Sequence, residues 1–177
     1  MVTPERTQTY GRPTEKADQG SLWLMINSLL KRLIMTGPSR SMIPVRIVLG
    51  TIFFVHGSQK LLGWFGGKGL IFSAQIFEAP YGLRPGLLWA SLAALTEFYA
   101  ALLVFSGLLT RLGALGLAAV MAIAICKVHL GSFLNPDGME FPLALLGASL
   151  TLFIYGGGWW SVDHALLRPS TRDDART

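Results

Sequence analysis

The sequence has few charged residues and a single cysteine, and each shortage excludes some classes of protein. Charged residues make up only 14% of the 177 positions and hydrophobic residues 51%, a balance typical of membrane proteins. With Cys126 alone, the chain has no internal dithiol, no Cys-x-x-Cys motif and no cysteine set for an iron–sulfur cluster or a structural zinc. A self-contained disulfide-generating enzyme is therefore excluded, and no metal cofactor is predicted.

Three further signatures are missing. The first twenty residues are polar and have no apolar core with a cleavage site, so we predict no signal peptide. The glycine run at 156–158 lacks the strand and helix context of a phosphate-binding loop, and we expect no nucleotide cofactor. The net charge of +5 fits membrane topology and attraction to anionic head groups, so no nucleic-acid partner is predicted.

Four long stretches nearly free of charge predict membrane spans. They cover residues 43–62, 86–109, 112–133 and 141–157. About 20 helical residues cross a hydrocarbon core of ~30 Å, and the fourth stretch is short for this. Because most connections are short, neighbouring spans should be antiparallel. The predicted fold class is all-α, a transmembrane up-and-down four-helix bundle with an N-terminal interfacial amphipathic helix.

That interfacial helix is predicted from "SLWLMINSLLKRLIM" at residues 21–35. Its polar side chains, including Lys31 and Arg32, recur at helical spacing against apolar ones, as in helices that lie in the membrane interface. A helix packed on the bundle by its apolar face is the alternative. The predicted organisation is a disordered tail at 1–20, the interfacial helix and linker at 21–40, the membrane domain at 41–167 and a disordered tail at 168–177.

Basic residues predict the orientation of the spans. Lys and Arg precede the first span, separate the second from the third and follow the fourth, whereas the third connection, "GSFLNPDGME", has none. Lys68 and Arg84 in the first connection weaken this asymmetry. We expect a multi-pass protein of a prokaryotic plasma (inner) membrane with both termini in the cytoplasm.

Three ionisable residues inside the spans form the main candidate site. His56 and Lys60 lie one turn apart on the first span, and Glu97 lies near the middle of the second, within a stripe of alanines that marks a packing face. A charge at this depth costs about 3 kcal/mol or more unless it is paired. We expect the first-span pair to meet Glu97 and to exchange protons with it. The alternative is a static polar staple that fixes helix register.

The third span offers one interior candidate. Ala118, Ala122 and Cys126 repeat every fourth residue, and His129 continues this face, so we predict that His129 points inward and that Cys126 is a small packing residue. Lys127 lies about 200° from His129 around a helix and is expected to reach head groups or to reach sideways to a neighbour.

Two further charged residues lie at span ends. Glu140 at the start of the fourth span is either a helix cap or a ligand-binding residue. Arg46, near the start of the first span, is expected to snorkel to the head groups. A haem between His56 and His129 is disfavoured because their depths differ and large aromatic neighbours leave little room.

Several motifs together resemble the DoxX family of small four-span membrane proteins. They are "PVRIVLGTIFFVHGSQKLLGWFGG", with its Gly57-x-x-Lys60; the Glu97 span followed by "GLLTR" at 107–111; "KVHLGSF"; and the closing "GGGWWSVD" at 156–163. The resemblance runs from about residue 44 to residue 167 in the expected order and spacing.

The resemblance implies a redox function. Members of the family are linked to quinone-coupled oxidation of sulfur compounds, to membrane-bound thiol and oxidative-stress complexes, and to quinone detoxification. It implies a membrane subunit of a quinone-linked oxidoreductase system with quinone as cofactor. The expected catalytic residues are Glu97, His56 and Lys60, and the expected ligand-binding residues are His129, Glu140, Gln59 and Arg46.

Two other functions remain open on the sequence. One is a non-catalytic membrane scaffold that docks soluble redox enzymes through the interfacial helix and "GWWSVDHAL". The other is a small-solute transporter, which four spans make less suitable unless the chain dimerises. The expected partners are the lipid membrane, a soluble redox protein or second membrane subunit, and a further copy of the chain.

Overall fold

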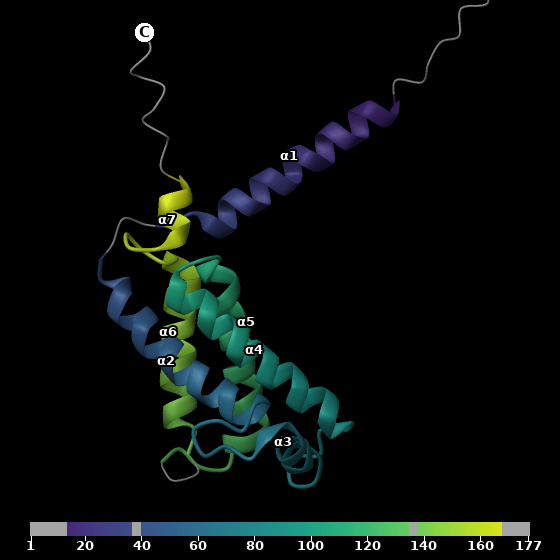
Figure 1. The fold of residues 1–177 in the computed structure, drawn as a ribbon, viewed down its shortest axis with the longest axis vertical. Coiled ribbons are helices and arrows are strands. Elements are labelled where there is room, and N and C mark those ends of the chain that lie inside the picture. The colour runs from purple at the N-terminus through teal and green to yellow at the C-terminus, as the bar shows by residue number, and fades with distance from the viewer. Residues whose placement is uncertain (1–13, 37–39, 135–137, 168–177) are drawn as a thin grey trace, which may run out of the picture. The chain divides into compact units, whose positions relative to one another are not determined.

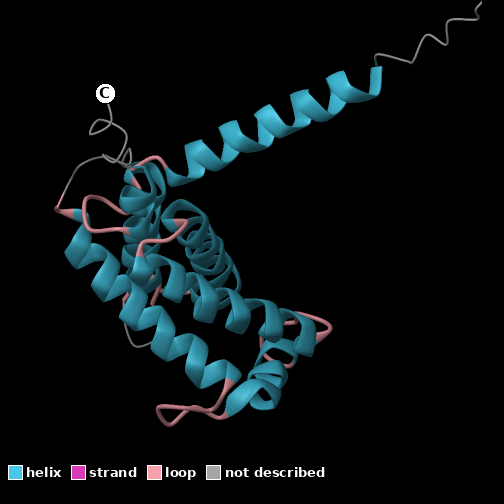
Figure 2. Cartoon of the chain, turned by 45° about the horizontal axis from the view of Figure 1, so that its top comes forward, coloured by secondary structure: helices cyan, strands magenta, loops and turns pink. Residues whose placement is uncertain are grey.

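The computed structural model describes residues 14–36, 40–134 and 138–167, which form helices and loops with no β-strand in these ranges (Figure 2). The helices, labelled in Figure 1, are α1 (Thr14–Ile34), α2 (Met42–Leu61), α3 (Gly69–Glu78), α4 (Gly86–Ser106), α5 (Thr110–Ala124), the single π-helical turn η1 (Ile125–His129), α6 (Glu140–Tyr155) and α7 (Val162–Leu167). The all-α prediction is confirmed.

Within the described ranges, three helices are long and apolar enough to cross a membrane: Met42–Leu61, Gly86–Ser106 and Thr110–His129, the last formed by α5 and η1 together. The fourth predicted span corresponds to α6, whose 16 residues extend about 24 Å at 1.5 Å per residue, short of the ~30 Å core. α6 ends because Gly156 adopts a φ of 77°, so the glycine run does not continue the helix.

Helix α1 up to Arg32 belongs to a unit distinct from the rest of the chain and is described by itself. It begins at Thr14, seven residues before the expected start, within the segment predicted as a disordered tail. The large apolar side chains Trp23, Leu24 and Leu29 are exposed. The predicted tails at 1–13 and 168–177 lie outside the described residues.

The bundle is built around α4, which packs on α2, α3 and α5, while α6 packs on α5 and α2. The face of α4 at the core carries Ala90, Ala94 and Ala101, each with no exposed surface, and the predicted alanine stripe is confirmed. Small side chains let helix backbones approach closely. Leu49, Phe53, Leu117 and Leu152 fill the remaining core.

The buried face of α5 differs from the predicted one. Ala118 is buried, but Ala122 and Cys126 are exposed, and the core side of the helix is formed instead by residues such as Ala114, Leu117 and Met121. Steps of four residues drift about 40° around a helix at each repeat, so the stripe leaves the core after Ala118. The interpretation of Cys126 as a packing residue is therefore wrong.

Arg46 is buried at the end of the bundle where α2 begins and α4 ends. Its side chain is 4% exposed, and its guanidinium donates hydrogen bonds to four backbone oxygens: those of Val104 (3.0 Å), Phe105 (2.9 Å), Gly157 (3.0 Å) and Trp160 (2.6 Å). The last carbonyls of a helix have no partner within it, so the cation satisfies acceptors at the end of α4. The prediction that Arg46 snorkels to the head groups is wrong.

Asp163 is the second buried charge at this end, which we call the Arg46 end. The carboxylate accepts hydrogen bonds from the Leu109 nitrogen (2.7 Å) and from the nitrogen and hydroxyl of Thr110 (both 2.9 Å). These donors lie at the start of α5, where amide groups lack helical partners, so Asp163 caps that helix from a distant part of the chain.

Candidate functional site

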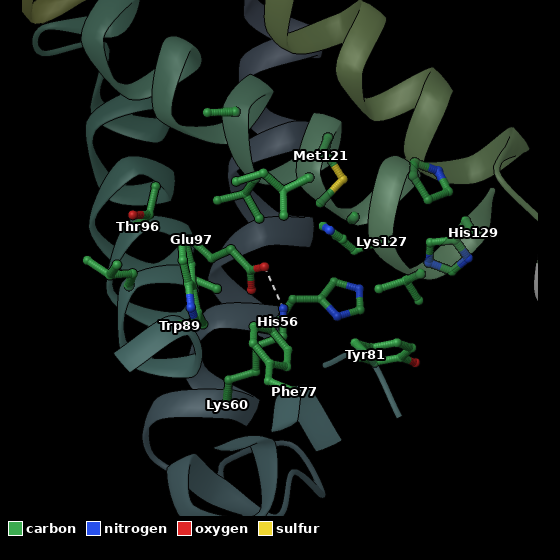
Figure 3. Close-up of a pocket in the computed structure, with 18 of the residues that line it drawn as sticks. His56, Lys60, Phe77, Tyr81, Trp89, Thr96, Glu97, Met121, Lys127 and His129 are labelled. Carbon is green, nitrogen blue, oxygen red and sulfur yellow. Dashed lines mark hydrogen bonds and ion pairs between the residues drawn. The ribbon is translucent and has the colours of Figure 1, made fainter. Parts of the chain in front are cut away.

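A cavity of about 710 Å³ lies at the opposite end of the bundle, where α2 ends and α4 begins (Figure 3). Its wall is contributed by α2, α3, α4, α5, η1 and α6 and is mostly apolar. Ionisable side chains on this wall are few: His56, Lys60, Glu97, Lys127, His129 and Tyr81. We call this the cavity end of the bundle.

The central feature of the cavity wall is an ion pair between α2 and α4. The Lys60 Nζ lies 2.5 Å from Oε1 of Glu97, whose side chain is 1% exposed, while that of Lys60 is 29% exposed. Gly57 brings the two helices together here, because a Cβ atom at this position would lie 2.6 Å from the Phe98 nitrogen. The predicted meeting of Lys60 with Glu97 is confirmed.

The second carboxylate oxygen of Glu97 is unusual. Oε2 is buried and has no hydrogen-bond partner among the described residues. A buried acceptor without a donor costs about 1–3 kcal/mol, and more when it carries charge. Glu97 therefore lines the cavity, and its second oxygen, buried beneath the wall, is a strong acceptor for which the described part of the chain provides no donor.

His56 lies beside this pair. Figure 3 shows its imidazole ring next to the Lys60–Glu97 contact, and the ring interacts electrostatically with both charges. Unlike Glu97, the His56 side chain is exposed, so it lines the cavity without being enclosed by the core. The three residues predicted as catalytic thus come together at one wall.

Lys127 and His129 both line the cavity from η1 (Figure 3). The prediction placed only His129 inside and directed Lys127 away from that face, and for Lys127 it is wrong. The cavity is wide enough to border both side chains, and η1 has the i→i+5 spacing of a π-helix instead of that of an α-helix. Single π-helical turns within α-helices occur frequently at functional sites.

Three predicted ligand-binding residues lie outside the cavity wall. Gln59 donates from Nε2 to the Phe65 oxygen (3.1 Å) in the loop between α2 and α3. Glu140 is the first residue of α6, and its backbone nitrogen donates to the Phe133 oxygen at 3.1 Å. Arg46 lies at the other end of the bundle and binds backbone oxygens there.

Aromatic residues on the wall were not selected from the sequence. Phe77 and Tyr81 come from α3 and the turn after it, and Trp89 from the first turns of α4. Trp89 lay within the second predicted span, whereas Phe77 and Tyr81 fell in the connection between the first two spans. The apolar run "GLIFSAQIF" at 69–77 was a signal for a short helix there. α3 packs on α4 and closes that side of the cavity.

The fold and the cavity define a small helical membrane protein with a charged pair inside an apolar bundle. The model of the DoxX family matches residues 41–130, and the chain belongs to this family. An uncharacterized protein of Haemophilus influenzae is 29% identical over 129 residues, covering 72% of this chain and 83% of the relative.

A second relative is an uncharacterized membrane protein of Mycobacterium tuberculosis. It is 28% identical over 160 residues, covering 82% of this chain and 93% of that protein. Both relatives are bacterial, in accord with the predicted prokaryotic origin. No solved structure matches the chain significantly.

Proposed function

We propose that the cavity binds a quinone headgroup and that the protein is the membrane subunit of a quinone-linked oxidoreductase system, acting in sulfur, thiol or quinone redox chemistry. The observation that carries the proposal is the Lys60–Glu97 pair in the wall of a mostly apolar cavity of about 710 Å³. Cavities of ~300–1,000 Å³ with apolar walls and a few placed polar groups are typical of small-molecule sites.

The composition of the wall suits such a ligand. A quinone ring is flat and apolar, and the Phe77, Tyr81 and Trp89 side chains supply aromatic surface for it. Its two oxygens need polar partners, and their reduction needs a route for protons. Lys60 and His56 can donate hydrogen bonds, and Glu97 can accept and pass a proton.

These groups indicate which steps this chain carries out and which are left to a partner. This chain binds and orients the headgroup and moves protons, whereas electrons come from a partner, either a soluble redox protein or a second membrane subunit. With both termini in the cytoplasm, as we propose from the basic residues, the cavity lies in the outer half of the membrane.

The test is identification of the bound molecule. The protein is purified from native membranes in mild detergent, and extracted lipophilic molecules are identified by mass spectrometry for the wild type, Glu97→Gln and Glu78→Gln. Glu78 is a matched control because it is half-exposed at the end of α3 and its oxygen accepts from the Gly86 nitrogen, which a Gln side chain can also do.

We expect stoichiometric quinone, in either redox form, in the wild type and in Glu78→Gln, and a reduced but measurable content in a folded Glu97→Gln protein. Quinone absent from all three preparations contradicts the proposal. If, in addition, a soluble redox protein co-purifies with every variant, the scaffold function takes its place.

A further inference from the structure

We infer that the cavity binds the reduced form of its ligand, the quinol, in preference to the oxidised quinone. This inference rests on the proposed function and adds to it the redox form that the site selects. Its basis is a buried acceptor of a wall residue, Oε2 of Glu97, which has no hydrogen-bond donor among the described residues.

The first step concerns the hydrogen-bonding character of Glu97. The Lys60 ammonium has donors only, so the 2.5 Å contact makes Oε1 its acceptor. A carboxylate paired with an ammonium offers acceptor sites on both oxygens and has no donor of its own. Oε2 therefore has to be matched by a group that carries a hydrogen.

The second step compares the two ligand forms at this oxygen. A quinone carries two carbonyl oxygens, which are acceptors, so either one placed against Oε2 would bring two acceptors together. A quinol carries two hydroxyl groups, and each is both a donor and an acceptor. The hydroxyl hydrogen bonds to Oε2, and a hydrogen bond to a charged group is among the stronger ones in proteins.

The third step concerns the other polar groups. Lys60 and His56 can each donate to an oxygen of the ligand, and a hydroxyl oxygen accepts such bonds as a carbonyl oxygen does. The quinol thus gains a partner at Glu97 without losing one elsewhere. Because Oε2 lies beneath the cavity wall, a side-chain rotation there has to open its path to the ligand hydroxyl.

The experiment compares the two forms of one molecule. Decylubiquinone and decylubiquinol, the latter under anaerobic reducing conditions, are titrated into the detergent-solubilised protein by calorimetry. We expect the quinol to bind about tenfold tighter in the wild type and in Glu78→Gln. In Glu97→Gln the amide has both a donor and an acceptor, so the ratio should fall to near one.

Equal affinities, or tighter quinone, in the wild type overturn the inference and leave the proposed function standing. A preference that persists in Glu97→Gln also overturns it, because the selective group would then lie elsewhere. If neither form binds, the proposed function fails and the inference fails with it.

A second measurement does not depend on a folded mutant. The midpoint potential of the bound couple is compared with that of the free couple in the same detergent. For two electrons, a tenfold preference for the reduced form raises the potential of the bound couple by about 30 mV. An unchanged or lowered potential contradicts the inference.

Discussion

The two ends of the bundle both bury charges, but they treat them differently. At the Arg46 end, Arg46 and Asp163 are matched by backbone and hydroxyl groups at the ends of α4 and α5. At the cavity end, Glu97 has a partner for one oxygen and, among the described residues, none for the other. A buried charge whose hydrogen bonds are all made within the protein stabilises the fold. A charge on a cavity wall that lacks one hydrogen-bond partner is suited to bind a ligand.

The largest effect on stability is expected for Arg46→Ala. Four hydrogen bonds to backbone oxygens are lost at once inside the bundle, and loss of a buried charged network costs about 3–5 kcal/mol. Thermal unfolding in detergent, followed by circular dichroism, measures the loss. Arg111→Ala is the control, since the hydrogen bond that Arg111 donates within the described residues is an exposed one, to the Met35 oxygen. A stability near the wild type would show that Arg46 is not needed to hold this end.

Asp163→Ala should rank second. Removal of this cap leaves the nitrogens of Leu109 and Thr110 without a side-chain acceptor, and lost caps cost up to about 2 kcal/mol. We expect a lower unfolding temperature and unchanged quinone content by mass spectrometry. Loss of quinone from a folded Asp163→Ala protein would contradict the separation of the two ends.

Gly57→Ala should lower both the stability of the protein and its quinone content. The added methyl group would lie 2.6 Å from the Phe98 nitrogen, so α2 and α4 must move apart, at a typical overpacking cost of about 1–3 kcal/mol. The same movement lengthens the Lys60–Glu97 contact and should lower the bound quinone. Gly147→Ala is the control, because no atom lies within 4 Å of a Cβ built at Gly147. Equal behaviour of the two variants would contradict the close approach.

Glu97→Gln should cost little stability. The Gln side-chain oxygen can still accept a hydrogen bond from Lys60, and the Lys60 side chain is 29% exposed, so its ammonium is not enclosed by the core. We therefore expect the free energy of unfolding to fall by about 1 kcal/mol. Chemical denaturation measures it beside the quinone content. A loss of several kcal/mol without any bound ligand would favour the static staple over a binding site.

Removal of residues 1–32 should have the smallest effect. These residues form a unit distinct from the rest of the chain, while the Gly158 nitrogen binds the Thr36 hydroxyl within the retained part. The truncated protein should unfold at the same temperature as the full chain and keep its quinone. A marked loss of stability would indicate that α1 packs on the bundle by its apolar face.

The sequence predicted one part of the candidate site well and another part poorly. The Lys60–Glu97 contact follows from two facts visible in a sequence: charges at matching depths in apolar helices need partners, and an alanine stripe marks the packing face. The place of Lys127 at the edge of the cavity does not follow, because helical spacing assumes a regular α-helix and a narrow interior.

Arg46, at the opposite end of the bundle, is a second residue whose position the sequence did not predict. Snorkelling was expected because a long basic side chain near the start of a span can reach the interface. Its partners are instead backbone oxygens 58 to 114 residues away. Every residue carries such an oxygen, so a sequence does not indicate which of them will lack a partner. The role of Asp163 as a cap was missed for the same reason.

The sequence by itself determined that the chain is helical and which segments are apolar enough for a membrane, because both depend on local composition. It also determined that Glu97 requires a partner, because a charge in an apolar medium is costly. Only the tertiary structure decided which buried charges find all their hydrogen-bond partners. Hydrogen bonding depends on where helix ends and side chains from distant segments meet. Packing gives Arg46 four backbone acceptors, whereas one oxygen of Glu97 has no donor in the described part of the chain.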